Sequence, residues 1–195
     1  MDKYFLDTEF IDTGSTIDLI SIGIVCSDDR ELYLQSCEFD PDKASPWVQE
    51  HVFGSLLVCP NVSGNVRGIY AHEGGQCTFT DHIEDTPGTY SDCPWRTRKQ
   101  MMHEVASFFN PSDGFELWGW CAGYDFVALC QLFGTMMDLP QGWPHHIKEF
   151  QQILDERGIS DEELPTQEDG LHNALADAKH LKKLWGYIMK NDCWQ

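Results

Sequence analysis

The stretch Lys3-Tyr-Phe-Leu-Asp-Thr-Glu-Phe10 decides the fold of this 195-residue chain. Its aromatic and aliphatic residues predict a strand that lies well inside a sheet. Side chains on a strand alternate between the two faces, so Asp7 and Glu9 point the same way, opposite to Leu6 and Thr8. Two adjacent carboxylates repel each other and are costly to bury unless a cation compensates them. A divalent metal ion would do so; a solvated pair of acids at a strand end is the alternative.

The composition is that of one ordered globular domain, residues 1–195. Hydrophobic residues make up 42% of the chain and prolines number only 9, so the chain can bury a sizeable core. There is no run of 18 apolar residues and no apolar signal region behind Met1, and we therefore expect a cytoplasmic protein with no membrane segment. The net charge of −19 argues against tight binding of long duplexes, because phosphates favour lysine and arginine.

Residues 57–94 are predicted to be an insertion in the domain. They contain scattered glycines and prolines and no sustained hydrophobic period, and Ile69-Tyr70 with Cys77-Thr-Phe79 could form a small hairpin. Five potential zinc ligands also lie in this part of the chain: Cys59, His72, Cys77, His82 and Cys93. Their spacings match no familiar zinc module. Of the eight cysteines none forms a C-x-x-C pair, and those at 26, 37, 121 and 130 are interpreted as reduced core thiols.

The remaining patterns predict an α/β fold with a mixed central sheet. Three β-rich runs joined by short turns form an antiparallel meander, and a later strand followed by a turn and a helix adds an α/β unit with parallel strands. Helices then flank the sheet. The predicted strands are 3–10, 18–26, 31–39 and 115–121, and the predicted helices are 46–52, 101–109, 126–133, 146–157 and 171–189.

Three polar residues far from the first strand are further candidates for a site. Asp125 lies where a predicted strand turns into a helix, although an acid favoured by the helix dipole explains it equally well. Asp177 lines up at helical spacing with the apolar residues of the last helix, on the inward margin, where an unpaired acid is rare. His172 lies at the start of that helix; singly, it could be a capping or surface residue, and Asp177 could pair with a nearby lysine.

Taken together, these residues give the chain a resemblance to a known family. The segments Asp7-Thr-Glu-Phe10, Gly123-Tyr-Asp-Phe126 and His172…Asp177 resemble the DEDDh exonucleases of the RNase H-like superfamily. Within that family, the chain is most similar to the small mycobacterial-type 3′–5′ exoribonucleases. The segments that carry this closer likeness are Leu19–Gly23, Glu38–Pro41, Trp95–Arg98 and Tyr124–Cys130. The resemblance covers nearly the whole chain except the insertion and implies an RNase H-like fold.

The resemblance also implies a mechanism. Asp7, Glu9, Asp125 and Asp177 would bind two Mg²⁺ or Mn²⁺ ions that grip the scissile phosphate. His172 would act as the general base that takes the proton from the attacking water. Glu9 would also contact the terminal 3′-hydroxyl, and nucleoside monophosphates would leave from the 3′ end of single-stranded RNA or of short oligonucleotides.

Other residues are candidates for binding the substrate. Phe10 could stack on a terminal base. Arg96 and Arg98 could contact phosphates, or could equally pair with the many acids of the surface. A DNA-directed exonuclease and a non-catalytic nucleic-acid-binding protein of the same fold remain alternatives, since recognition of the 2′-hydroxyl depends on backbone geometry. We also expect a homodimer, because several members of the family are dimeric.

Overall fold

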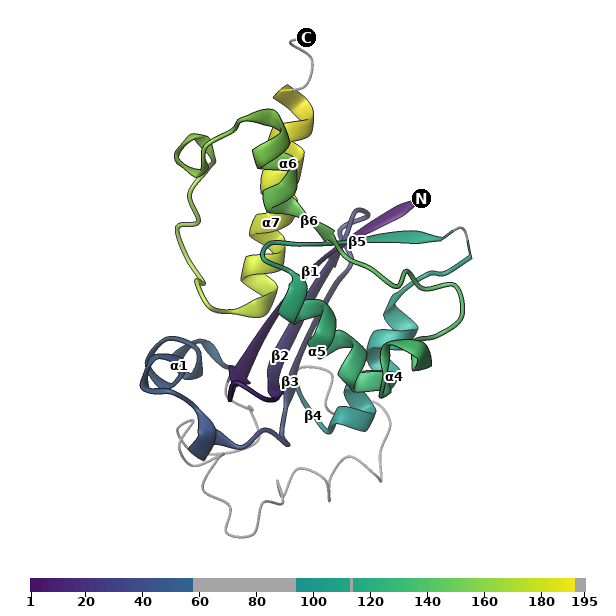
Figure 1. Cartoon of the computed structure of the whole chain (residues 1–195), viewed down its shortest axis with the longest axis vertical. Helices are drawn as coiled ribbons and strands as arrows, with labels where there is room; N and C mark the ends of the chain where they lie inside the picture. The colour runs from purple at the N-terminus through teal and green to yellow at the C-terminus, as the bar shows by residue number, and fades with distance from the viewer. Residues whose placement is uncertain (58–93, 113, 192–195) are drawn as a thin grey trace.

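A computed structural model describes residues 1–57, 94–112 and 114–191. The fold is α/β, with a six-stranded mixed sheet flanked by helices, as expected (Figure 1). The strands are β1 (Asp2–Asp12), β2 (Ile17–Cys26), β3 (Glu31–Ser36), β4 (Trp95–Arg96), β5 (Phe115–Gly119) and β6 (Lys148–Glu149). The helices are α1 (Pro46–His51), α4 (Arg98–Phe108), α5 (Gly123–Phe133), α6 (Phe150–Arg157) and α7 (Ala174–Asn191).

The strand β1 lies in the interior of the sheet, as its sequence predicts. The strand order is β4-β3-β2-β1-β5-β6. The strands β1, β2 and β3 pair antiparallel, which confirms the meander, whereas β5 runs parallel to β1 and β6 parallel to β5. Because β1 has a hydrogen-bonded neighbour on each side, its apolar residues Tyr4, Phe5 and Leu6 are almost completely buried.

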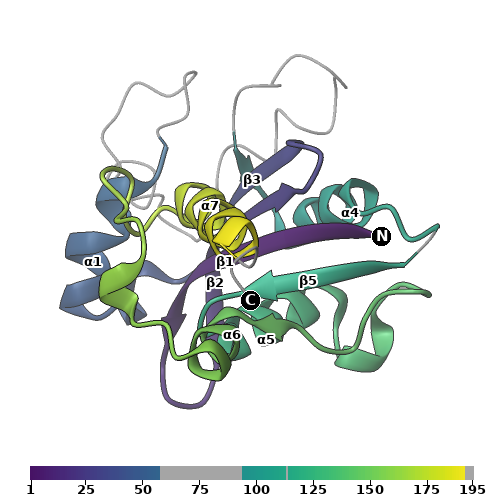
Figure 2. The same ribbon diagram turned by 90° about the horizontal axis from the view of Figure 1, so that it is seen from above.

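The helices cover both faces of the sheet (Figures 1 and 2). Helices α4 and α5 pack on the face to which Tyr4 and Leu6 point, in one continuous apolar cluster. Helices α6 and α7 pack on the other face, around Phe5. A third cluster joins the far end of β1, at Ile11, to the segment around α1. Each strand alternates between these cores, which is why one residue of register decides the face that a polar side chain reaches.

Helix α7 approaches the sheet unusually closely, as the small residues Ala174, Ala176 and Ala178 predict. The closest point is Gly23 on β2: a Cβ atom built there would lie 2.2 Å from the carbonyl oxygen of Ala174 and 2.3 Å from the nitrogen of Leu175. Gly23 is also the residue paired with Asp7 across β1 and β2. The first turn of α7 is therefore seated directly beside the acids of β1.

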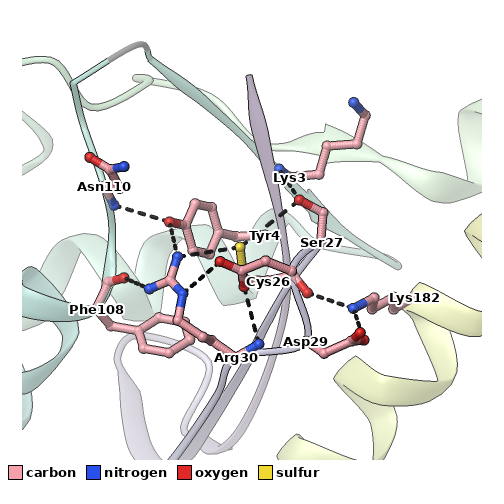
Figure 3. Close-up of polar contacts among 10 residues, drawn as sticks. Lys3, Tyr4, Cys26, Ser27, Asp29, Arg30, Phe108, Asn110 and Lys182 are labelled. Atoms are coloured by element: carbon pink, nitrogen blue, oxygen red, sulfur yellow. Dashed lines mark hydrogen bonds and ion pairs between the residues drawn. The ribbon is translucent and has the colours of Figure 1, made fainter.

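The turn between β2 and β3 holds the middle of the same helix (Figure 3). The ammonium of Lys182 on α7 donates to the carbonyl of Cys26 and to Asp29, both at 2.6 Å. In the same turn, the Arg30 guanidinium donates to the carbonyl of Phe108 at 2.9 Å and to the Tyr4 hydroxyl at 3.2 Å. The turn thus ties α7, α4 and β1 together on both faces of the sheet.

Several element boundaries differ from the predicted ones. Helix α4 starts at Arg98 because Thr97 and Gln100 form a capping box, and the residues before it form β4. Helix α6 starts at Phe150 because residues 148 and 149 pair with β5 as β6. The predicted third strand ends at Ser36, and α7 begins at Ala174, so that His172 precedes the helix. The cap at Gly158, in left-handed conformation, ends α6 as expected.

Some predictions fall on residues that the structure does not describe. These are the small hairpin, the zinc-ligand candidates and nearly all of the insertion at 57–94, so all three remain predictions. Among the described cysteines, Cys26 and Cys130 are buried free thiols, as expected, but the expectation for Cys121 is wrong because its residue is exposed at the turn before α5. No helix among the described residues is long and apolar enough to cross a membrane.

Candidate active site

The structure brings three of the four predicted acids together. Ligand oxygens of Asp7, Glu9 and Asp177 all lie within 4.8 Å of one another. Asp7 and Glu9 share a face of β1 because they are two residues apart. Asp177 joins them from the first turns of α7, where Leu181, Leu184 and Ile188 continue the same inward stripe. Residues 168 positions apart in sequence thus form one carboxylate cluster, with no cationic side chain of the described chain paired to it.

Asp125 reaches this cluster from the other side of β1. The strand β5 pairs with β1 only as far as Phe5, so the backbone of Thr8 has no strand beside it on that side. Asp125, in the first turn of α5, takes that place: its Oδ1 accepts the Thr8 N–H at 2.8 Å and the Thr8 hydroxyl at 2.5 Å. The carboxylate is almost completely buried, with 5% of the residue exposed. Asp125 is therefore anchored on the strand between Asp7 and Glu9.

The loop before α7 holds Asp177 in a fixed orientation. Its Oδ1 accepts from the side-chain amide of Gln167 at 2.6 Å, and its Oδ2 accepts from the backbone N–H of His172 at 3.0 Å. The helix itself begins at Ala174, and the side chain of the preceding Asn173 accepts the N–H of Ala176 at 3.1 Å, as an N-cap residue does. Neutral hydrogen-bond donors thus hold the carboxylate of Asp177 in place without neutralising its charge.

His172 lies beside the acids in a backbone conformation that is rare for its residue type. Its φ angle is 62°, in the left-handed region, which costs a non-glycine residue about 1–2 kcal/mol. Two bonds impose it: the N–H of His172 goes to Asp177, and its carbonyl accepts from the Ser55 hydroxyl. The imidazole makes an edge-to-face contact with Trp47, with ring centroids 4.8 Å apart. Strain of this kind, held by surrounding contacts, is characteristic of functional positions.

Burial disfavours ionisation of the four acids, and the charges of neighbouring site acids add to this effect at Asp7 and Glu9. Burial, with the charges of the other three acids, raises the pKa of Asp7 well above its usual value. Burial, with the charges of Asp177 and Asp125, raises the pKa of Glu9 to about 8. Burial raises the pKa of Asp125 to about 6 against the two bonds from Thr8, and burial also raises the pKa of Asp177. The chain therefore concentrates negative charge at a place where it is costly to keep.

Divalent cations fit this set of donors. Hard ions such as Mg²⁺ and Mn²⁺ prefer carboxylate oxygens, and oxygens within 4.8 Å of one another can share such an ion. A cation would offset the repulsion that helps to raise the pKa values of Asp7 and Glu9. The acids also open to solvent: a pocket of about 200 Å³ includes Asp7, Asp177, His172 and Gln167 in its lining. The cluster is thus both able to bind a metal and accessible to a substrate.

The predicted substrate-binding residues Phe10, Arg96 and Arg98 do not form one cluster as the acids do. Phe10 stacks on Tyr124, with ring centroids 5.6 Å apart and planes 20° apart, and Tyr124 is 52% exposed next to Asp125. Arg96 donates to Glu104, and Arg98 donates to Asp18, both in short ion pairs. Without substrate the two arginines therefore pair with acids of the chain itself, which was one of the two readings of the sequence. Their role in phosphate binding remains a prediction.

Sequence reasoning missed the residues that hold the site in place. Thr8 and Gln167 bind the carboxylates directly, and Trp47 contacts His172. Thr8 had a signal, since it lies between two candidate ligands on a buried strand. For Gln167 and Trp47 the sequence gives no periodic or motif signal, because both come from irregular or short segments whose position depends on tertiary packing.

Comparison with known proteins agrees with this geometry. Residues 82–189, which contain Asp125, His172 and Asp177, match the family described as the Rv2179c-like 3′–5′ exoribonuclease domain. Two proteins of Mycobacterium tuberculosis, each named a 3′–5′ exoribonuclease (Rv2179c of strain ATCC 25618 / H37Rv and MT2234.1 of strain CDC 1551 / Oshkosh), are 35% identical to this chain over 192 residues. Each alignment covers 97% of this chain and 95% of the relative. The chain therefore belongs to the Rv2179c-like 3′–5′ exoribonuclease family.

Proposed function

We propose that this protein is a metal-dependent 3′–5′ exoribonuclease of the DEDDh type with an RNase H-like fold. It would release nucleoside monophosphates from the 3′ end of single-stranded RNA or of short oligonucleotides. The observation that carries the proposal is the cluster of Asp7, Glu9 and Asp177, with their oxygens within 4.8 Å and with Asp125 anchored beside them. The names of the two mycobacterial relatives support the reaction.

Each of the four acids, and His172, has a part in the proposed reaction. Asp7, Glu9, Asp125 and Asp177 would hold two Mg²⁺ or Mn²⁺ ions. When bound, such ions polarise the scissile phosphate and make water a better nucleophile. His172 would accept the proton of the attacking water, since it lines the same pocket as Asp7 and Asp177. Glu9 would contact the terminal 3′-hydroxyl, which would confine the reaction to free 3′ ends.

The proposed substrate is a single strand because the surface offers stacking more than charge. The Phe10–Tyr124 pair is next to Glu9 and Asp125 in sequence, and the half-exposed Trp47 contacts His172. Base stacking contributes about 1–3 kcal/mol per base irrespective of sequence. The charge of −19 opposes binding of long duplexes. Action on DNA is the second candidate. Action in the cytoplasm as a homodimer, in a single domain spanning 1–195, is part of the proposal.

A release assay on matched 3′-labelled RNA and DNA oligomers, with and without Mn²⁺, tests the proposed function. We expect Mn²⁺-dependent release of monophosphates, faster from RNA. The substitution Asp7→Asn should abolish release while the protein stays folded, because it removes the carboxylate on which the charges of the other three acids all act. The exposed Asp42→Asn, far from β1 in sequence, is the matched control and should remain active. Normal turnover of Asp7→Asn in saturating Mn²⁺ would refute the metal assignment.

A further inference from the structure

Helix α5, which carries Asp125, begins without a cap of its own. Its N-cap residue, Ala122, has no side-chain acceptor, and the preceding residue, Cys121, has a left-handed φ of 54°. The turn is also tight, because a Cβ atom at Gly119 would lie 2.5 Å from the Cβ of Ala122. A helix start of this kind leaves backbone N–H groups unsatisfied and a strained residue unsupported unless another element supplies partners.

Glu149, on β6, supplies those partners. Its two carboxylate oxygens accept the N–H of Cys121 and the N–H of Ala122, both at 2.8 Å. One of the same oxygens accepts the N–H of Gln151 at 3.2 Å and so caps α6. A single carboxylate thus joins the starts of α5 and α6, although Glu149 and Cys121 are 28 residues apart in sequence. Charge-assisted bonds to backbone N–H groups are among the stronger hydrogen bonds in proteins.

We infer that Glu149 is a positioning residue for the metal site, because it fixes the turn that places Asp125 beside β1. Asp125 lies three residues beyond Ala122 and meets Thr8 only if the first turn of α5 is held in this orientation. Glu149 therefore contributes to the geometry of the site through the start of α5. The inference rests on the proposed metal dependence.

The inference is tested by isothermal titration calorimetry, which measures the affinity of the RNA-free protein for Mn²⁺. For Glu149→Ala we expect affinity for Mn²⁺ to fall by about 10–100-fold, the usual effect of losing a group that orients a ligand, and nucleotide release at limiting Mn²⁺ to fall with it. Excess Mn²⁺ should recover much of the release. The Mn²⁺ affinity of Glu149→Gln should lie between those of the wild type and Glu149→Ala, because one amide oxygen can replace only one of the two carboxylate acceptors.

Hydrogen exchange of the metal-free protein supplies a second measurement. The amides of Cys121 and Ala122 should exchange faster in Glu149→Gln, a variant that preserves side-chain size, while amides in β1 keep their protection. Glu156 is the matched control: it is an exposed acid of α6 that accepts from the side chain of Gln152, on the same helix, and Glu156→Gln should match the wild type in both measurements.

The outcomes separate this inference from the proposed function. A folded Glu149→Ala that binds Mn²⁺ as tightly as an active wild type overturns the inference and leaves the exoribonuclease proposal intact. A loss of thermal stability with unchanged Mn²⁺ affinity also overturns it, since Glu149 would then be only structural. If the wild type binds Mn²⁺ but releases no nucleotide, the proposed function fails, while weaker Mn²⁺ binding by Glu149→Ala still supports the role of Glu149.

Discussion

At the scale of single residues, the fold holds the groups of the site in energetically unfavourable arrangements. Four acids are kept close against their mutual repulsion, and His172 is kept in a left-handed conformation by Asp177 and Ser55. Neither arrangement favours the stability of the metal-free protein. Both are expected where a site must present fixed negative charge and a proton acceptor to one phosphate.

The role of His172 can be separated from the strain of its backbone. As the proposed general base, His172 would contribute about 10²–10⁴-fold to turnover, so His172→Ala and His172→Asn should both lose that factor. Asparagine tolerates a left-handed backbone better than other non-glycine residues, which makes His172→Asn the better test. Metal affinity should change little, because the four acids are the proposed ligands.

Single-turnover release at saturating Mn²⁺ measures the effect, and the exposed His103→Ala, on α4, is the control. If His172→Asn retains activity while His172→Ala does not, His172 maintains the conformation of the loop, and another group accepts the proton of the attacking water.

At the scale of elements, the contact between α7 and β2 assembles the site. Gly23 pairs with Asp7 across the sheet and lies under the first turn of α7. Because no side chain separates the helix from the strand there, Asp177 comes within reach of Asp7 and Glu9. The lysine at position 182 then fixes the other end of the contact against the β2–β3 turn.

The substitution Gly23→Ala tests this contact. The added methyl group would lie 2.2 Å from the backbone of Ala174, so α7 must shift, at a cost of about 1–3 kcal/mol in the free energy of unfolding. We expect Mn²⁺-dependent release to fall by more than the loss of folded protein accounts for, since Asp177 moves with the helix.

Denaturant unfolding and release assays measure the two effects. Gly186→Ala on the same helix meets nothing within 4 Å and should raise stability by about 0.4–1 kcal/mol with activity unchanged. Full activity of Gly23→Ala would show that the close contact is not needed for the site.

At the scale of the whole molecule, the acids make the stability of the metal-free protein depend on pH. The pKa of Glu9 is raised from 4.5 to about 8 in the fold, so between these values the folded state binds more protons than the unfolded state. The free energy of unfolding must then fall as pH rises through this window and level off above about pH 8. Bound Mn²⁺ should reverse much of this loss at pH 8, because it binds only the folded cluster.

Thermal unfolding from pH 4.5 to 9, in chelator and in Mn²⁺, measures this dependence. Glu9→Gln should flatten the metal-free curve and raise its melting temperature at pH 8, with a smaller gain on adding Mn²⁺. The exposed Glu50→Gln, on α1, should follow the wild type. A metal-free stability that rises with pH across this window would contradict the raised pKa values.

The sequence by itself determined the first strand, the meander, the sheet class and the four acids with His172. Alternation on a strand and periodicity on a helix are local properties. Asp7 and Glu9 could therefore be assigned to one face of their strand, and Asp177 to the inward margin of its helix, before any contact was known.

Only the tertiary structure decided which groups hold those residues. Thr8 binds Asp125 because β5 ends early, Glu149 reaches the start of α5 because β6 pairs beside β5, and Gly23 matters because α7 crosses it. Cys121 could not be placed correctly for the same reason: an apolar neighbourhood in sequence did not show that a turn would expose it. Hydrogen bonds between distant segments depend on how the chain closes, and no local pattern encodes that closure.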